Sequence, residues 1–411
     1  MTDSSVGGSS LRRAAPPLAP LGRATLLRTL GGVLLIAGLL AAAAWLHGTP
    51  GHGAAASFSL LIGAALGFIF ERGRFCFFCI FRDFIEDRNG GPMYAVLAAL
   101  AVGGIGYAVI FGAFLPNPLA GRLPPEAHIG PVSWALALAG FAFGIGMALS
   151  GACISGHLYR LGEGYSRAPL ALFGALIGFG LGFYTWNTLY LATIAGAPTG
   201  WLPAWFGYGG ALAIHLLTLG VLAIVLLRFV QLRPARPEQR IDLRTIHHTL
   251  FGERWNPLVT GALVGVIGVF AYLRVEPLGV TAQIGSIART LLNHAGLLPP
   301  RLNGLDTLAG CATQVVQAIT DNGWLITGFV LASLAAALLA NRFALSQLTP
   351  HNSATALLGG VLMGWGSMTA LGCTVGTLLS GISAFALSGW VFAAAAFVGV
   401  YLGVKFGLNR S

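Results

Sequence analysis

The sequence predicts an all-α integral membrane protein with about nine to ten transmembrane helices, together with short re-entrant or broken helices. Three observations carry this prediction. Only 9% of the 411 residues are charged, whereas roughly a quarter of the residues in a soluble domain are charged. Hydrophobic residues make up 56% of the chain. They gather in segments long enough to cross a hydrocarbon core, which takes about 17 to 25 residues.

Ten apolar segments of this kind follow one another along the chain. They are residues 28–46, 55–71, 92–115, 131–152, 168–190, 208–230, 257–273, 323–341, 355–373 and 388–408. The region 279–322 is too polar for a simple span and too long for a plain loop. We therefore expect short re-entrant or interfacial helices there, one of them in IGSIARTLLNHAGLL.

The distribution of the basic residues predicts which loops lie on the cytoplasmic side of the membrane. If the N-terminus is cytoplasmic, 19 of the 23 lysines and arginines fall on the cytoplasmic side of these spans. The positive-inside rule expects such a bias. The sequence therefore predicts that both termini are cytoplasmic. The basic residues left outside are Arg122, Arg274, Arg289 and Arg301.

The first 54 residues look like an addition to the rest of the chain. We expect residues 1–27 to form a cytoplasmic tail and residues 28–54 to form an extra N-terminal transmembrane span. A second interpretation is a cleaved signal sequence, because SLRRAA precedes the apolar run and AAAAW ends it. Cleavage would leave nine spans.

A hydrophilic stretch divides the remaining chain. Residues 228–256, RFVQLRPARPEQRIDLRTIHHTLFGERWN, are interpreted as a basic cytoplasmic linker. They separate a first transmembrane half, 55–227, from a second, 257–411. The first half contains five of the predicted spans, an odd number, so the second half must be inverted relative to the first. Inverted repeats are a common plan of secondary transporters.

The two halves carry a related glycine-rich motif. GIGMALSGACISGHL, Gly144 to Leu158, aligns without gaps on GWGSMTALGCTVGTL, Gly364 to Leu378, and pairs Cys153 with Cys373. Such small residues allow close helix packing and a break that exposes backbone N–H groups to a buried ligand. The alternative is plain helix packing, in which each cysteine is only a small hydrophobic residue.

A second motif places charges beside thiols. In FERGRFCFFCIFRDF, residues 70–84, Arg72 and Arg74 precede Cys76 and Cys79 within an aromatic stretch. Charges near hydrocarbon are costly unless they are paired or face a cavity. The segment is either an interfacial helix whose arginines reach the surface or a basic, thiol-bearing vestibule for an anion.

Several classes of function lack their signatures in this sequence. There is no G-x-x-x-x-G-K-[ST] phosphate loop and no zinc-finger spacing among the five cysteines. The net charge of +10 is scattered between apolar runs, unlike a nucleic-acid-binding domain. Acidic residues are nearly absent from the spans, which argues against a carboxylate proton relay. We predict a transporter without a cofactor or metal, and not an enzyme.

Three motifs together resemble a known family. RGRFCF with FRD, GIGMALSGACISGHLYRLGEG and ALGCTVGTLLSG are similar to motifs of the YeeE/YedE family of bacterial inner-membrane proteins, whose characterised members take up thiosulfate. The resemblance implies an hourglass-shaped helical fold with internal pseudo-symmetry. It also implies a narrow path lined by Cys76, Cys153 and Cys373, which hand thiosulfate along by S–H hydrogen bonds. Cys79 and Cys311 have no place in this trio, and their roles stay open.

The expected substrate-binding residues extend the trio to its neighbours. A neutral thiol donates a weak hydrogen bond to a soft dianion without adding a charge. Conduction needs weak, successive sites, so arginines belong at the cytoplasmic mouth and not in the narrow part. The predicted set is Cys76, Cys153, Cys373, Ser150, Ser155, Gly151, Gly156, Gly372, Thr374, Gly376, Arg72 and Arg74.

Two alternative functions remain open at this stage. The same fold can carry another sulfur or selenium species. In a different class, Cys76 and Cys79 can form the C-x-x-C pair of a membrane thiol-redox protein. Family members often work beside a small cytoplasmic sulfur-carrier protein, so we expect such a partner in addition to the lipid bilayer. The sequence shows no site for a coupling ion.

Overall fold

The computed structural model describes residues 23–230, 251, 253–308 and 313–409. Over these residues the chain is helical, with two isolated β-bridges, Pro131 to Thr199 and Trp201 to Ala386. Nine helices of the described chain are long and apolar enough to cross a membrane, or ten if one bent pair counts as a single span. The predicted all-α membrane fold is thus confirmed. Residues 1–22 of the predicted tail, 231–250 of the predicted linker, and Cys311 lie outside the described residues.

Each of the ten predicted apolar segments overlaps one long helix. These helices are α1 (Arg23–His47), α2 (Gly53–Gly73), α4 (Met93–Phe114), α5 (Trp134–Ser150), α7 (Arg167–Leu189), α8 (Pro203–Leu227), α10 (Pro257–Arg274), α12 (Asp321–Leu339), α13 (Pro350–Thr369) and α15 (Leu387–Lys405). Long apolar runs form helices in a membrane because a helix satisfies its own backbone hydrogen bonds.

Shorter helices lie between the long ones. They are α3 (Phe77–Asp87), α6 (Ile154–Gly162), α11 (Ala282–His294), the π-helix η5 (Thr374–Ser380) and α14 (Gly381–Ser383). One-turn pieces η1 (Pro118–Ala120), η2 (Tyr190–Ile194) and η4 (Leu305–Thr307) lie in connections. Helix α11 confirms the short helix expected in the polar region 279–322.

The helices follow one plan four times. A long helix ends, the chain breaks for a few residues, a short helix follows, and a second long helix completes the unit. The units are α2–α3–α4, α5–α6–α7, α10–α11–α12 and α13–η5–α14–α15. The motif alignment relates the second unit to the fourth, whereas the likeness of the first and third is visible only in the structure.

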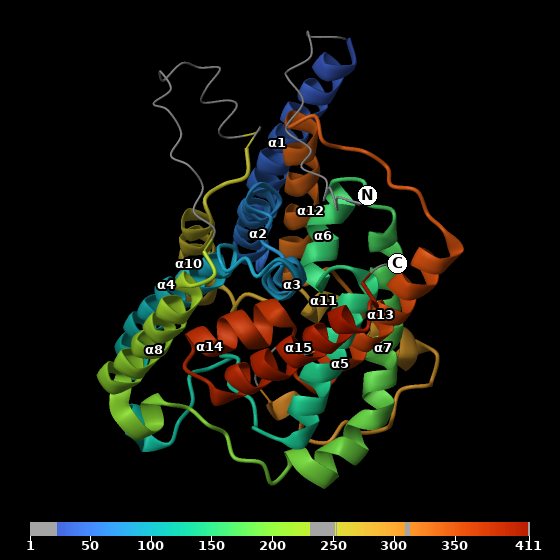
Figure 1. Ribbon diagram of the computed structural model, residues 1–411. Coiled ribbons are helices and arrows are strands. Elements are labelled where there is room, and N and C mark those ends of the chain that lie inside the picture. The colour runs from blue at the N-terminus through green and yellow to red at the C-terminus, as the bar shows by residue number, and fades with distance from the viewer. Residues whose placement is uncertain (1–22, 231–250, 252, 309–312, 410–411) are drawn as a thin grey trace, which may run out of the picture.

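The long helices form three groups (Figure 1). Helices α1, α2 and α12 run together at the top of the view, α4, α8 and α10 at the left, and α5, α7 and α13 at the lower right. Helix α15 packs against α5. The short helices α3 and α6 lie between the groups, and each follows a break in the chain.

Glycines bring α5 and α13 into backbone contact and show that they run in opposite directions. A Cβ atom at Gly146 would lie 2.6 Å from the carbonyl oxygen of Gly359, and one at Gly366 would lie 2.6 Å from that of Ala139. Such spacing requires residues without a side chain, as in other membrane helix pairs. The residue numbers of these contacts rise along α5, from 139 to 146, while their partners in α13 fall from 366 to 359. The two aligned motifs therefore have opposite directions, as inverted halves require.

Candidate functional site

Three of the four breaks place a cysteine at the start of the short helix. Cys76, Cys153 and Cys373 are the N-cap residues of α3, α6 and η5. All three are fully buried and belong to one apolar cluster. All three are free thiols. The fold thus brings together residues that are up to 297 positions apart, 373 minus 76.

Cys76 and Cys153 are in direct contact. Their Sγ atoms are 3.7 Å apart, and either can donate a hydrogen bond to the other. Cys153 also lies 3.2 Å from the Ser155 hydroxyl and accepts a hydrogen bond from the Gly156 backbone N–H at 3.3 Å. The Cys153 sulfur is thus surrounded by hydrogen-bonding groups without a formal charge. Such an arrangement can bind a soft anion weakly.

Small residues make this contact possible. A Cβ atom at Gly156 would lie 2.6 Å from the Cys76 sulfur and 3.3 Å from the Cys153 sulfur. Gly151 ends α5 with a φ of 82°, which a residue with a side chain rarely adopts. The Ser150 hydroxyl stabilises the break by donating to the carbonyl oxygens of Gly146 and Ala152, which lie on either side of Ser150 in the sequence. Of the predicted serines, Ser155 contacts the Cys153 thiol, and Ser150 hydrogen-bonds to the backbone of the break.

The break before Cys373 opens toward a pocket. Gly372 precedes it with a φ of 158°. A Cβ atom there would lie 2.6 Å from the Thr377 hydroxyl and 3.5 Å from the His128 ring. Thr374 and Gly376 are buried in η5, and the Thr374 hydroxyl has no hydrogen-bond partner among the described residues.

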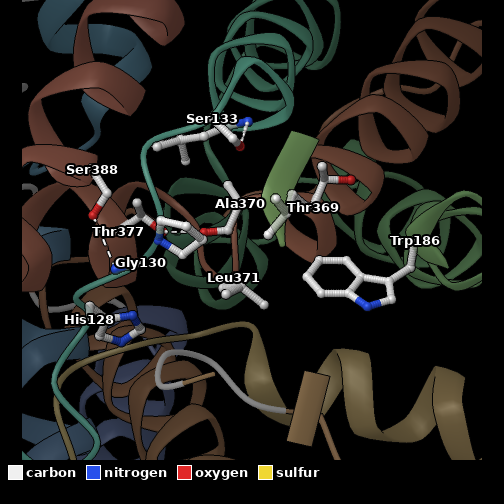
Figure 2. Close-up of a pocket in the computed structure, with 12 residues that line it drawn as sticks. His128, Gly130, Ser133, Trp186, Thr369, Ala370, Leu371, Thr377 and Ser388 are labelled. Carbon is white, nitrogen blue, oxygen red and sulfur yellow. Dashed lines mark hydrogen bonds between the residues drawn. The ribbon is translucent and has the colours of Figure 1, made fainter. Parts of the chain in front are cut away.

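The pocket itself was not predicted from the sequence (Figure 2). It lies where α5 begins and α13 ends, and the polar groups of its side chains are hydroxyls, one imidazole and the indole N–H of Trp186. The Thr369 hydroxyl is buried without a partner in the described chain. Burial lowers the pKa of His128 to about 4, so this ring is neutral near neutral pH. The lining is His128, Gly130, Pro131, Ser133, Leu136, Trp186, Ile194, Thr369, Ala370, Leu371, Thr377 and Ser388.

The sequence offered little signal for this pocket. His128 stands alone in a loop between two spans, and the threonines and serines that join it come from both halves. Only the fold brings them together. The pocket is bounded by the same residues, Thr369 to Leu371, that lead into Cys373.

The third unit has its own buried polar residue at the equivalent break. Thr281 is the N-cap of α11, as the cysteines are in the other units. It is fully buried, and its hydroxyl has no hydrogen-bond partner among the described residues. Its neighbours Leu278 and Val280 belong to the same apolar cluster as the three cysteines. The motif comparison missed this break because no cysteine marks it.

The two predicted arginines at the end of α2 lie in ion pairs. Arg72 and Glu71 are both fully buried and their side chains lie 3.2 Å apart. Arg72 also donates to the carbonyl oxygen of Glu253 at 2.7 Å. Arg74 lies 3.4 Å from Glu163, which follows α6. Among the described residues no hydrogen bond or ion pair joins either arginine to a thiol. Their binding of substrate stays a prediction.

Metal chemistry has no support in the described part of the chain. No group of three or more His, Cys, Asp or Glu residues there is arranged to hold a metal ion. The thiols lie instead among apolar side chains and backbone N–H groups. Thiols in such surroundings can donate weak hydrogen bonds to a soft anion.

Comparisons with known proteins point to the same kind of function. A family model described as sulphur transport matches residues 72–402. The thiosulfate transporter TsuA of Escherichia coli strain K12 is 28% identical over 348 residues, 81% of this chain and 89% of that protein. TsuA of Spirochaeta thermophila is 29% identical over 81% of this chain and 93% of its own length. The probable transporter YedE of Salmonella typhimurium is 28% identical over 47% of this chain and 46% of its own.

Proposed function

We propose that this chain, which belongs to the sulphur transport family, the YeeE/YedE family, imports thiosulfate across the bacterial inner membrane. The single observation that carries the proposal is the meeting of Cys76 and Cys153, from different units, at 3.7 Å. Two relatives named as thiosulfate transporters cover 81% of the chain. Their names supply the substrate, and the thiols supply chemistry that suits it.

The proposed path runs from the pocket to the opposite face. The anion first meets the hydroxyls of the pocket lining and then Cys373, which lies two residues after the lining residue Leu371. It passes next to Cys153 and Cys76. The path then continues beside helices α3 and α6, and α6 ends near the Arg74–Glu163 pair.

Neutral thiols suit a dianion better than arginines in the narrow part. Among the described residues, Cys76 and Cys153 make hydrogen bonds to each other, to a hydroxyl and to a backbone N–H, none of which is charged. A weak S–H donor releases the anion as easily as it binds it, and conduction needs such release. A fixed guanidinium at the constriction would trap the substrate instead.

The orientation follows from the basic residues. We place both termini and the linker 228–256 in the cytoplasm, and the pocket on the periplasmic side. Residues 28–54 are then an additional span outside two transmembrane halves, 55–227 and 257–411. A small sulfur-carrier protein at the cytoplasmic face is the partner that would consume the imported sulfur.

Growth on thiosulfate tests the proposal. In a host that lacks its own thiosulfate uptake, expression of the chain should restore growth with thiosulfate as the sulfur source. Cys153→Ala and Cys373→Ala should abolish that growth while the protein still inserts in the membrane at normal level. Normal growth of both variants would refute the thiol path.

A second cargo on the same path has one observation in its favour. The YedE relatives are named as probable transporters without a substrate, so the fold alone does not fix the cargo. Competition of labelled thiosulfate uptake by sulfite, sulfate and selenium compounds separates the cargoes. If a selenium compound competes more strongly than unlabelled thiosulfate, the second cargo replaces the first. The thiol-redox alternative would require that Cys79→Ser stops growth while Cys153→Ala does not.

A further inference from the structure

Cys79 and Arg160 form a pair on the inner side of the two touching thiols. The Arg160 Nη2 group donates to the Cys79 sulfur at 2.9 Å. Its Nη1 group donates to the carbonyl oxygen of Gly151 at 2.9 Å. Arg160 therefore bridges α3 and the break between α5 and α6.

The spacing of residues along α3 and α6 places Cys79 and Arg160 on the same helix faces as the two touching thiols. Cys79 lies three residues after Cys76, and Arg160 lies seven residues after Cys153. Residues three, four and seven apart share one face of a helix. Cys76 meets Cys153, and Cys79 meets Arg160 further along the same two helices. The second contact is a continuation of the first.

Arg160 has no carboxylate partner among the described residues. Among the described residues, Arg72 is paired with Glu71, Arg74 with Glu163, and Arg82 with Asp83 and Glu86. No Asp or Glu of the described chain lies within 4.0 Å of Arg160. It rests against the rings of Tyr159 and Tyr165, at 6.0 and 5.4 Å from its guanidinium carbon.

A half-buried guanidinium without a carboxylate is suited to an anion. It carries five N–H donors in a planar fork, and the two bonds described above leave others for a ligand. Charged groups at membrane depth are costly unless they are paired or serve a pathway. Among the described residues Arg160 donates to a thiol and to a carbonyl oxygen, and neither group neutralises its charge.

We propose that Arg160 and Cys79 form an inner anion-binding station, which receives the sulfur oxyanion from Cys76 and Cys153. The guanidinium binds the sulfonate oxygens, and the Cys79 S–H donates to the terminal sulfur. This station rests on the proposed function. It explains why a fourth thiol lies on α3, and it places the one strong anion ligand after the narrow part rather than within it.

Protection of Cys79 from alkylation tests the station. Inside-out vesicles that contain the full chain are treated with a membrane-impermeant maleimide, and labelling of the Cys79 peptide is followed by mass spectrometry. Thiosulfate should slow the labelling of Cys79 at least about threefold in the wild type and have no effect in Arg160→Gln. Failure of the reagent to reach Cys79, or labelling at the same rate with and without thiosulfate, would overturn the station.

Uptake kinetics supply a second readout in right-side-out vesicles. Arg160→Gln should lower the rate of labelled thiosulfate uptake by about tenfold or more, because it removes a charge-assisted hydrogen bond. Arg160→Lys should recover only part of the rate, since it keeps the charge and loses the fork. The matched control is Arg88→Gln, which removes an exposed positive charge at the end of α3 and should keep the wild-type rate. Wild-type rates in Arg160→Gln would contradict the station alone, whereas absent uptake by the wild type would contradict the proposed function itself.

Discussion

At the residue scale, the decisive feature is that two sulfur atoms touch where two helix breaks meet. Cys76 and Cys153 come from different units, yet both cap a short helix and both are fully buried. A buried thiol is also compatible with plain packing. What distinguishes this pair is the hydrogen-bonding shell of Cys153, which includes a hydroxyl and a backbone N–H.

The glycine beside the thiols supplies the first prediction. In Gly156→Ala the new methyl group would lie 2.6 Å from the Cys76 sulfur, so this sulfur must shift from its contact with Cys153. We expect thiosulfate uptake to fall by at least about tenfold, the effect of losing one to two hydrogen bonds. The control is Gly220→Ala in α8, where nothing lies within 4 Å of the added Cβ atom. Unchanged uptake in Gly156→Ala, with equal protein in the membrane, would show that the sulfur contact is not needed.

A second residue-scale prediction concerns Glu276, which follows α10. Burial, together with the nearby charges of Asp321 and Glu126, raises the pKa of its carboxyl to about 7. The folded protein therefore binds this proton more tightly than the unfolded chain does. The resulting stability is present below the ordinary pKa of 4.5 and is lost as the pH rises through about 7.

Thermal unfolding of the purified protein measures this effect. The melting temperature should fall between about pH 4.5 and pH 7, the interval that separates the two pKa values. In Glu276→Gln, which resembles the protonated form, the fall should be smaller. If both proteins show the same slope, Glu276 does not titrate in this interval.

At the element scale, the structure depends on helices that approach through glycine. Gly178 of α7 would place a Cβ atom 2.7 Å from the backbone nitrogen of Trp365 and 2.9 Å from the Cα of Gly364, both in α13. Gly178→Ala should therefore destabilise the protein by about 1 to 3 kcal/mol, the usual cost of overpacking. Melting temperatures of this variant and of Gly220→Ala in the same detergent check the prediction. Equal melting temperatures would contradict the close packing of α7 and α13.

The elements that could be predicted from the sequence are those that coincide with long hydrophobic runs. All ten apolar segments became long helices, because membrane length is a strong constraint on composition. The short helix in 279–322 was also expected from its polarity. The four-unit plan was not, because the break before α11 carries Thr281 where the others carry cysteine. Helix geometry is shared by the units although their side chains differ.

The candidate site was predictable only in part, for a physical reason. The cysteines stood out because cysteine is rare in this chain and recurs in a glycine-rich frame. The partner of Arg74 did not stand out, since Glu163 lies 89 positions after it, 163 minus 74. The pocket around His128 is likewise assembled from distant loops and helix ends. Contacts between distant segments depend on the fold, which local patterns do not reveal.

At the scale of the whole molecule, the two faces differ in chemistry. The pocket face has hydroxyls and a neutral imidazole, and its described lining includes no Asp, Glu, Lys or Arg. The opposite face has arginines around α3 and α6, most of them paired with carboxylates. On the proposed path, an anion would move from neutral ligands in the pocket toward the arginines of this face. The antiparallel α5 and α13 bring one cysteine motif from each half to the buried middle.

Uptake of labelled thiosulfate into proteoliposomes of purified protein tests the central claim most directly. The wild type should show saturable uptake, and Cys153→Ala and Cys373→Ala should each reduce it to the level of protein-free liposomes. Circular dichroism and melting temperature should show that both variants remain folded. Uptake by both folded variants at the wild-type rate would contradict a path that passes through the thiols.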